Sequence, residues 1–516
     1  MPYEAEESIE EKSVKATTTA SYLAFSGLFT LIVYGIAFVA IARLLGPSNY
    51  GAYVIAVSVA GAFGAVGNFG IATYLERNIP KAKSSGELQR LIGSSIATIL
   101  LLGTIIVLVG LAFSHYLTFV LFHSFAYFGV LIVAIVSIVF SMLYGVGHGA
   151  LIGFNDGKGS TIASIVYTIS QATVSVALVL LGFGVMGAVL GLFAGLSIGS
   201  LVVLWRIRKH TPIALSIKEF KERAKSIFSF SLPIAGSNFF SSLPSNIGVM
   251  LLAMYVASST IGDYGVASRV ESILGIFTGS MVVLLPFFSS LNLERKKETS
   301  EILSYMLYLI YLFATPFVVF FVMFAHPIMY TVFPRYEGVY VYIAIMSASL
   351  LISILGAPAS SIVVSKAKVK KVLAFSAIVG LTELALLVLL IPYFTIYALI
   401  GVLYFVGPAI VDFLYLHEIG KDAIKVFPRR IYRIAFANLL LVLVFMPVLL
   451  IKMYPTLKLA VAFVLLFIVY PPIIGLTKAV RKRDIKIIET ITSRVPMMNG
   501  IIRAVLSYAA LFAAIE

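Results

Sequence analysis

Long apolar runs recur along the whole chain, separated by short polar links. Each run holds about 20 residues, which is the length that crosses a hydrocarbon core of about 30 Å as a helix. A membrane barrel would instead show alternating segments of about ten residues, and lipid forces backbone groups to bond within their own segment. The pattern therefore predicts an all-α polytopic membrane protein with about fourteen spans. They lie at 20–42, 52–75, 91–113, 124–145, 160–182, 184–206, 227–255, 263–290, 303–326, 338–361, 371–392, 396–416, 432–452 and 457–477.

The chain is predicted to be doubled. A Tyr-Gly pair stands at the start of span two, at Tyr50-Gly51, and at the start of span eight, at Tyr264-Gly265. Six spans separate the two pairs, so the halves have the same orientation, as in transporters built from parallel repeats. We expect two six-helix lobes around a central cavity, followed by a helix pair. The predicted parts are an N-terminal segment 1–19, a first lobe 20–206, a basic linker 207–226, a second lobe 227–416, helices thirteen and fourteen at 417–477, and an interfacial tail 478–516.

Charge sets the predicted orientation. Of the 516 residues, 60% are hydrophobic and 12% are charged, against about 25% charged in soluble domains. The net charge of +15 comes from Lys and Arg in alternate links, most densely in 207–226. The positive-inside rule makes that side cytoplasmic, so both termini lie in the cytoplasm of a multi-pass cell-membrane protein. Because topology and anionic lipid headgroups account for the basic residues, we expect no nucleic-acid partner.

Nothing in the sequence indicates an enzyme. The six histidines are scattered, mostly at span ends, without ligand spacing or a paired carboxylate, and cysteine is absent. The glycine-rich run at 145–150 loosely fits a dinucleotide fingerprint, but it follows a membrane span rather than a strand. We therefore expect no catalytic residues, no cofactor and no metal.

Several short motifs resemble those of a known family, in the same order and spacing. They are Ala42-Arg43-Leu44-Leu45-Gly46-Pro47-Ser48-Asn49-Tyr50-Gly51 in the first link, Gly70 to Arg77 at the end of span two, Phe230-Ser231-Leu232-Pro233 at span seven, and Phe333-Pro334-Arg335-Tyr336-Glu337 between spans nine and ten. Together they resemble the polysaccharide flippases, in the superfamily that includes multidrug and toxin extrusion transporters and lipid II flippases. One departure is that Asn246-Ile247-Gly248 stands where the family often carries an Asp-Arg pair.

The resemblance implies a two-lobed flippase that moves a polyprenyl-(di)phosphate-linked oligosaccharide from the cytoplasmic to the outer leaflet by alternating access, for cell-surface polysaccharide or glycoprotein assembly. Its partners would be that lipid, the membrane and glycosyltransferases or a polymerase of the same pathway. Arginine suits an anionic head group through its bidentate fork. The candidates are Arg43, Arg77 and Arg269, with a snorkelling anchor as the alternative for Arg43 and a topology arginine for Arg77.

Glu383 is a candidate for ion coupling. It lies near the middle of span eleven, where a charge costs several kcal/mol unless it is paired, hydrated or protonated. The alternative is a structural pair with Asn246 or Asn438. Asp412 is expected at the interface. Asn68, Gln171, Asn238 and Asn246 are polar candidates for the cavity, or else join helices to one another.

Two other functions compete with the flippase. A drug or cation extruder of the same superfamily would favour acidic residues within spans one to six, which hold none. A membrane-embedded glycosyltransferase or polymerase would need a large outer loop or catalytic carboxylates, and the outer links are short. A scaffold without transport is a further alternative.

Overall fold

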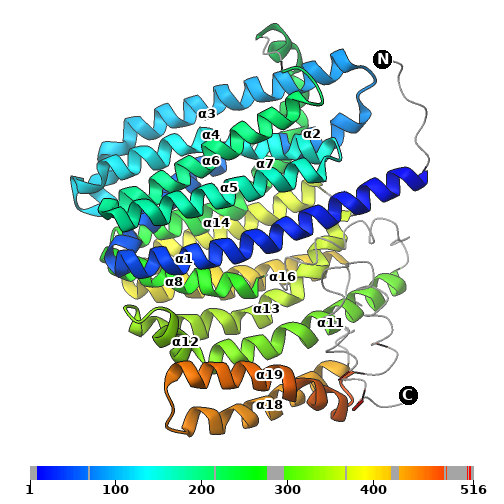
Figure 1. Cartoon of the computed structure of the whole chain (residues 1–516). Coiled ribbons are helices and arrows are strands. Elements are labelled where there is room, and N and C mark those ends of the chain that lie inside the picture. Colours follow the sequence, from blue (N-terminus) through cyan, green and yellow to red (C-terminus); the bar gives the residue numbers. More distant parts are fainter. Residues whose placement is uncertain are drawn as a thin grey trace. The chain divides into compact units, whose positions relative to one another are not determined.

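The computed structural model describes residues 9–67, 70–213, 217–275, 296–365, 369–419 and 429–480, with Asp484, Tyr508 and 511–512. Every element longer than a turn in these ranges is helical, as predicted (Figure 1). Asn68, the second half of span eight, parts of the basic links and most of the tail lie outside the described residues.

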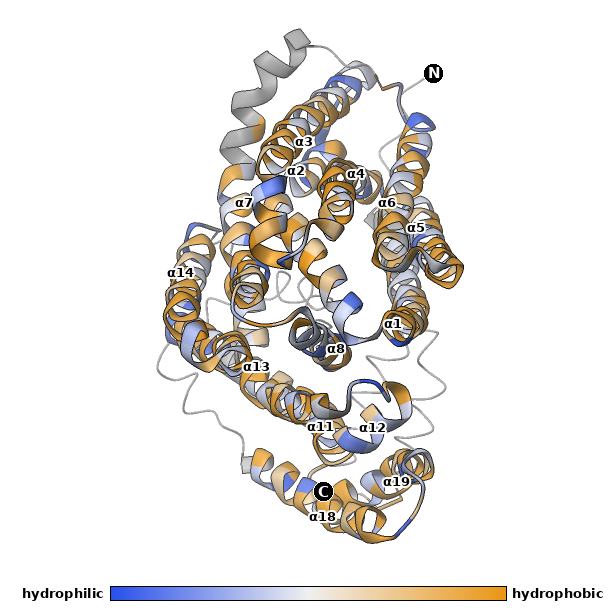
Figure 2. Cartoon of the chain, turned by 90° about the vertical axis from the view of Figure 1, so that its left-hand side faces the viewer, coloured by the Kyte–Doolittle hydropathy of each residue, from blue (hydrophilic) through white to orange (hydrophobic). Residues whose placement is uncertain are grey.

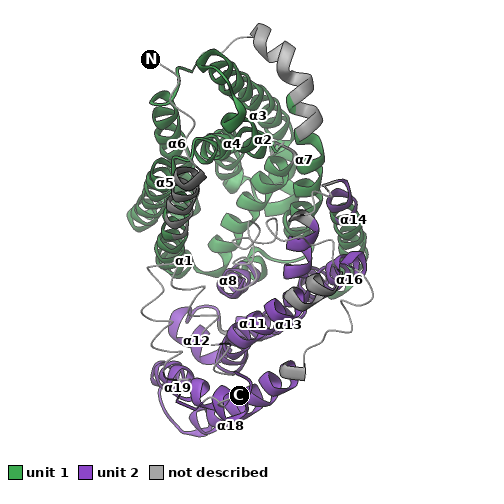
Figure 3. Ribbon diagram, turned by 90° about the vertical axis from the view of Figure 1, so that its right-hand side faces the viewer, with its two compact units in different colours: residues 1–262, 376–395 green, residues 263–375, 396–516 purple. Residues whose placement is uncertain are grey.

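The chain forms two compact units, coloured separately in Figure 3. Unit 1 comprises 1–262 and 376–395, and unit 2 comprises 263–375 and 396–516. The helices of unit 1 are α1 Ile9–Gly67, α2 Ile71–Asn78, α3 Ser85–Phe122, α4 Phe128–Gly153, α5 Gly157–Leu178, α6 Gly184–Arg208, α7 Ile217–Ala253 and most of α14 Val369–Phe394. Those of unit 2 are most of α8 Ser258–Leu274, α11 Lys296–Met323, α12 Ala325–Val332, α13 Tyr340–Ser365, α15 Ile396–Gly401, α16 Gly407–Ile419, α18 Arg429–Leu450 and α19 Pro455–Leu476.

Ten helical stretches of the described residues are long and apolar enough to cross a membrane (Figure 2). Two of them, Phe25–Ala65 and Gly157–Arg208, each contain two predicted spans. The ten therefore account for twelve of the fourteen predicted spans, and α7 and the beginning of α8 correspond to the other two. The chain is a multi-pass membrane protein.

Glycine marks the places where adjoining spans meet. Spans one and two join within α1 at Gly46, which leaves the helical region at φ 71°, ψ 173°. Spans five and six join through a π-helical turn, Val179–Phe183, in which Gly182 has φ 89°. A positive φ is strained for any residue with a β-carbon, so glycine permits both junctions.

A row of polar contacts within unit 1, here called the seam, joins α1 to α5 and to Asn155 just before α5. Four side-chain hydrogen bonds cross it, and the partners in each are separated by 136 to 139 residues. The bonds run from Thr19 Oγ1 to the Asn155 carbonyl (3.0 Å), from Thr161 Oγ1 to the Tyr22 carbonyl (2.8 Å), between the Thr30 and Thr168 hydroxyls (3.2 Å), and from the Tyr34 hydroxyl to Gln171 Oε1. A nearly constant separation means that the two helices run in the same direction, as expected for spans one and five.

The same arrangement recurs between α7 and α14, which carry spans seven and eleven. The Ser376 hydroxyl bonds the hydroxyls of Ser237 (2.8 Å) and Ser241 (3.3 Å), residues that precede it by 139 and 135 positions. Spans seven and eleven are spans one and five moved on by six. This is the helix pairing that the predicted parallel six-helix repeats require.

Helices α18 and α19 lie outside the repeats and pack on α11 within unit 2. Asn438 of α18 donates to Thr315 Oγ1 at 2.7 Å, and Tyr470 of α19 donates to the Leu312 carbonyl at 2.9 Å. Both bonds are buried in an apolar cluster that includes Phe320 and Phe445. Asn438 is thus a residue that joins helices.

Candidate functional site

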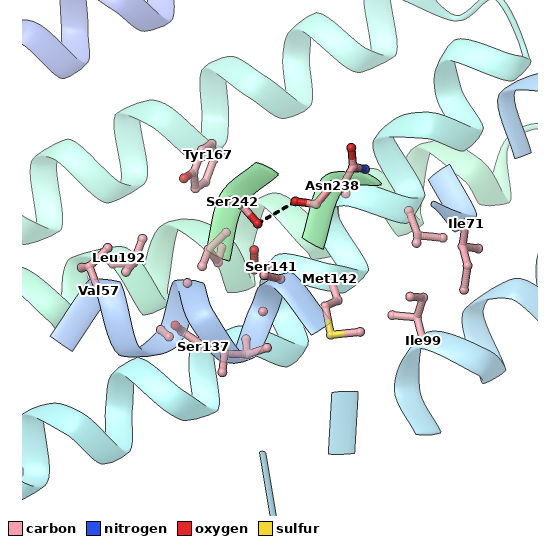
Figure 4. A pocket seen from close by; sticks show the side chains of 18 of the residues that line it. Val57, Ile71, Ile99, Ser137, Ser141, Met142, Tyr167, Leu192, Asn238 and Ser242 are labelled. Atoms are coloured by element: carbon pink, nitrogen blue, oxygen red, sulfur yellow. Dashed lines mark hydrogen bonds between the residues drawn. The ribbon is translucent and has the colours of Figure 1, made fainter. Parts of the chain in front are cut away.

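A pocket of about 710 Å³ lies within unit 1, between its helices (Figure 4). Its polar lining comes from Ser137 and Ser141 on α4, Tyr167 on α5, and Asn238, Ser241 and Ser242 on α7. The rest of the lining is apolar or glycine, namely Val57, Ala60, Gly61, Gly64, Ala65, Ile71, Ile99, Ile138, Met142, Gly145, Val146, Leu192 and Leu196.

Small residues keep this pocket open. A β-carbon built on Gly145 meets no atom within 4 Å, and one on Gly64 meets only Ile138 at 4.0 Å. By contrast, Gly147 on the same helix faces Val203, 2.1 Å from where its β-carbon would lie, and so serves close helix packing. On α4, Gly147 therefore permits close helix packing, whereas Gly145 leaves open space in the pocket.

The pocket is polar without being charged. None of the residues lining it is Asp, Glu, Lys, Arg or His. Among the described residues, the Asn238 amide and the Ser141 hydroxyl form no hydrogen bond, and both residues are exposed. Figure 4 shows the Ser141 hydroxyl directed toward Ser242. These groups are free to donate and accept hydrogen bonds to a ligand.

The other predicted polar candidates occupy different places. Gln171 is buried in the seam, where it accepts from Tyr34. Asn246 donates to the Ser242 carbonyl at 2.9 Å, and a β-carbon on Gly61 would lie 2.3 Å from its Oδ1. Gln171 therefore joins two helices. Asn246 bonds its own helix and packs against Gly61 of α1, whereas Asn238 lines the pocket.

Glu383 is 8% exposed on α14, and among the described residues no side chain pairs with it. One turn earlier, Gly380 lies against α7 so closely that a β-carbon would be 2.1 Å from the Phe240 carbonyl oxygen. That oxygen lacks its helical partner, because residue 244 is proline and has no N–H. Glu383 lies one turn after Gly380 on the same face of α14, and this face meets α7 at the freed carbonyl.

The three predicted arginines are all exposed and lie on different helices, with Arg43 on α1, Arg77 in the last turn of α2 and Arg269 on α8. Arg269 has a polar neighbourhood in unit 2 that the sequence did not indicate. The charges of Arg269 and Glu271 both act on Tyr404, whose side chain is hydrogen-bonded to Tyr264.

Asp412, predicted to lie at the membrane interface, is buried within the protein. The residue is 6% exposed on α16, with its carboxylate against α13, where a β-carbon on Gly356 would lie 2.2 Å from Oδ1. No described side chain pairs with it. Hydropathy placed it near a span end but gave no information on which side of the helix faces the protein.

A cluster around Asp156 was also missed. Asp156 caps α5 by accepting the Gly159 N–H at 2.8 Å, and Arg206 Nη2 donates to both of its oxygens at 2.8 Å. His210 Nε2 lies 3.0 Å from Oδ2, and its ring stacks on Phe154. Burial alone would raise the pKa of Asp156, but the bonds from His210, Arg206 and Gly159 hold it below its ordinary value. The Asn155-Asp156-Gly157 sequence before an apolar run is a helix-start signal that could have identified it.

Two parallel six-helix repeats, an added helix pair and an uncharged polar pocket define a polytopic membrane protein with a transporter fold. A family model described as polysaccharide biosynthesis protein matches residues 17–292, more than half of the chain, and the chain belongs to this family. The resemblance seen in the sequence motifs is thus confirmed.

A curated relative is the succinoglycan biosynthesis transport protein ExoT of Rhizobium meliloti (strain 1021), 22% identical over 299 residues. The match covers 56% of this chain and 58% of ExoT, so the chain spans little more than half the length of that relative.

Solved structures with a similar fold include the lipid II flippase MurJ in an inward closed conformation, with a TM-score of 0.69 at 17% identity, covering 87% of this chain and 98% of MurJ. An inward-facing multidrug resistance MATE family transporter of the MOP superfamily has a TM-score of 0.56 at 18% identity, covering 81% and 98%.

Proposed function

We propose that this protein moves a polyprenyl-phosphate- or diphosphate-linked oligosaccharide from the cytoplasmic to the outer leaflet. The observation that carries the proposal is the membership of the polysaccharide biosynthesis protein family, on a fold shared with a lipid II flippase. The uncharged pocket supports it, because a site for organic cations would favour a carboxylate and this pocket has none.

The anionic head of such a lipid needs fixed positive charge. In this proposal Arg43, Arg77 and Arg269 supply it. Arginine binds phosphate oxygens in pairs through its planar fork and stays protonated throughout the cycle. The lipid tail remains in the bilayer, so the protein has to shelter only the polar part of its substrate.

Glu383 is proposed to couple the cycle to an ion. A buried carboxyl group without a described side-chain partner, on the helix face that meets a carbonyl freed by Pro244, has the ligand types that a proton or a hard cation takes. The ion has to bind one arrangement of the protein more tightly than the other, since equal affinity shifts nothing. Glycosyltransferases that build the lipid-linked sugar and a polymerase that consumes it are the proposed pathway partners.

The test is a flipping assay in proteoliposomes loaded with fluorescent undecaprenyl-diphosphate-linked oligosaccharide. A membrane-impermeant lectin or glycosidase measures how fast the sugar crosses. The protein is expected to accelerate crossing over empty liposomes. If it leaves crossing unchanged but exports rhodamine or ethidium, the cation extruder is the correct function.

A further inference from the structure

We infer that the pocket of unit 1 is a subsite for a neutral sugar residue of the substrate, separate from the arginines that bind its anionic head. The inference rests on the proposed function and specifies which part of the ligand this pocket takes. Four features of the pocket support it: its volume, its lack of charged residues, its hydrogen-bonding groups and its aromatic wall.

The volume suits a small ligand rather than a whole oligosaccharide. About 710 Å³ lies within the ~300–1,000 Å³ typical of small-molecule sites. An assembled lipid-linked oligosaccharide is much larger than such a site. The pocket thus accommodates one or two sugar units, while the remainder of the substrate lies outside it.

The lining residues carry no charge, and this determines which chemical groups the pocket can bind. Without Lys or Arg, the pocket has no positive charge to pair with a phosphate, a uronate or a pyruvate substituent. Without Asp or Glu, it has no negative charge to pair with an organic cation. What it does offer are hydroxyl and amide groups, which pair with sugar hydroxyls as both donors and acceptors.

Those groups come from opposite walls. Ser137 and Ser141 belong to α4, whereas Asn238, Ser241 and Ser242 belong to α7. The Ser137 hydroxyl is already bonded to the Ala134 carbonyl at 2.6 Å, and Ser242 to the Asn238 carbonyl at 2.8 Å. Asn238 and Ser141 carry no such bond among the described residues, so they are the groups available to a ligand.

The aromatic wall is Tyr167 of α5. Its ring is held in place by the Tyr144 ring at 5.0 Å and the Tyr34 ring at 6.0 Å. A fixed aromatic face beside free amide and hydroxyl groups provides an apolar surface for the C–H face of a pyranose and polar partners for its edge. This combination favours a neutral sugar over an alkyl chain, which would leave the amide unsatisfied.

The experiment uses the absence of cysteine from the chain. A Ser141→Cys variant in nanodiscs is labelled with a fluorescent maleimide, alone and with soluble probes. The probes are neutral tetrasaccharides of glucose, galactose, mannose and N-acetylglucosamine, an oligogalacturonate and tetraphenylphosphonium. At least one neutral probe is expected to slow labelling, and the uronate and the cation are not. A Ser48→Cys variant, exposed on α1 away from the pocket, should be labelled at the same rate in every case.

Two substitutions then link the protection to the pocket. Asn238→Ala, made on the Ser141→Cys background, should raise the sugar concentration for half-protection about three- to tenfold, as expected for one lost hydrogen bond. Gly145→Leu should fill the cavity and abolish protection without a clash, since its β-carbon has open space. Gly27→Leu on α1, where a β-carbon also meets nothing within 4 Å, is the matched control.

Protection by tetraphenylphosphonium, or by none of the neutral probes, overturns the assignment. The assignment is also overturned if the sugar still slows labelling in the Gly145→Leu variant, with the same concentration for half-protection as in its parent. Loss of flipping in Gly145→Leu, with normal flipping in Gly27→Leu, supports it. Normal flipping in both variants would contradict the subsite but not the proposed function. If sugar slows labelling but the protein flips no lipid-linked oligosaccharide, the subsite is supported and the proposed function is contradicted.

Discussion

Gly51 and Gly262 lie backbone against backbone. A β-carbon on Gly51 would be 1.6 Å from the Ser258 carbonyl oxygen, and one on Gly262 would be 2.1 Å from the Pro47 carbonyl oxygen. Each glycine approaches the amide nitrogen of the other, at 2.9 and 3.1 Å from the built β-carbons. The contact is therefore reciprocal, as expected where equivalent elements of two repeats meet, and it joins the beginnings of spans two and eight.

Replacing Gly51 by valine should separate these helices. Overpacking of a tight contact costs about 1–3 kcal/mol, and here the obstruction is backbone that has no rotamer to change. We expect a clear decrease in the thermal unfolding midpoint of the detergent-purified protein. Gly27→Val, on α1 in open space, should leave the midpoint unchanged. Equal midpoints for the two variants would show that the glycine contact is dispensable.

The Asp156 cluster predicts a pH dependence of stability. The pKa of Asp156 is lower in the folded protein than its ordinary value, so the charged carboxylate stabilises the fold. That stabilisation is fully present above the unfolded pKa of about 3.9 and is lost as the pH falls through the still lower folded value. The unfolding midpoint should therefore decrease more steeply on acidification in the wild type than in Asp156→Asn.

Asp156→Asn keeps a residue that caps helices well and removes the charge. At neutral pH we expect a loss on the order of 1 kcal/mol from the charge-assisted bonds to Arg206 and His210. Glu418→Gln, which removes an exposed ion pair with Lys371, is the control for a surface charge. An acid response identical to that of the wild type would show that Asp156 is not the group responsible.

Arg269 should require the shape of arginine as well as its charge. Arg269→Ala is expected to reduce flipping by about tenfold or more, and Arg269→Lys by less, since lysine retains the charge but loses the bidentate fork. Initial rates in the proteoliposome assay measure both variants. Full activity of both would argue against an anionic group binding at this residue.

Glu383→Gln mimics the protonated form and keeps the shape of the side chain. If an ion binds there, the variant should fold with the wild-type midpoint but transport slowly and without response to a proton or sodium gradient. A residue with a structural role would instead show reduced expression or a lower midpoint. Unchanged transport in the variant, together with wild-type transport that is indifferent to both gradients, would leave consumption of the product as the driving force.

The orientation can be tested at Ser216, in the basic linker. A Ser216→Cys variant on this cysteine-free background should react with a membrane-impermeant maleimide only after the cells are opened. The reason is the density of Lys and Arg in the linker, which keeps it cytoplasmic. Labelling in intact cells would reverse the orientation and with it the direction proposed for transport. Ser48→Cys, in the first outer link, should show the opposite accessibility.

Hydropathy predicted the spans well, because crossing a membrane demands about 20 apolar residues whatever the protein does. The doubling was also accessible, from Tyr-Gly pairs at Tyr50 and Tyr264. What hydropathy did not provide is rotation about each helix axis. A window of residues around Asp412 looks the same whether the carboxylate faces lipid headgroups or Gly356.

The site was predictable only in part for the same reason. Asn238 and Gln171 look equivalent in the sequence, as polar residues within spans. In the structure Gln171 accepts from Tyr34 in a seam, whereas Asn238 lines a pocket. The pocket itself depends on the absence of side chains at Gly145 and Gly64. A single sequence does not show whether a glycine faces a cavity or a neighbouring helix.

The seam between α1 and α5 limits how the first lobe can move. Its four bonds have nearly the same separation along the chain, 136 to 139 residues, so sliding α1 by one residue would disturb all of them together. Tilting the two helices as a pair breaks none. The two helices of the seam therefore move as one rigid pair. Any rearrangement has to occur at the ends of these helices, where Gly46 and Gly182 adopt backbone conformations that other residues avoid. Stiffening those two junctions, rather than weakening the seam, would be the way to slow this protein without unfolding it.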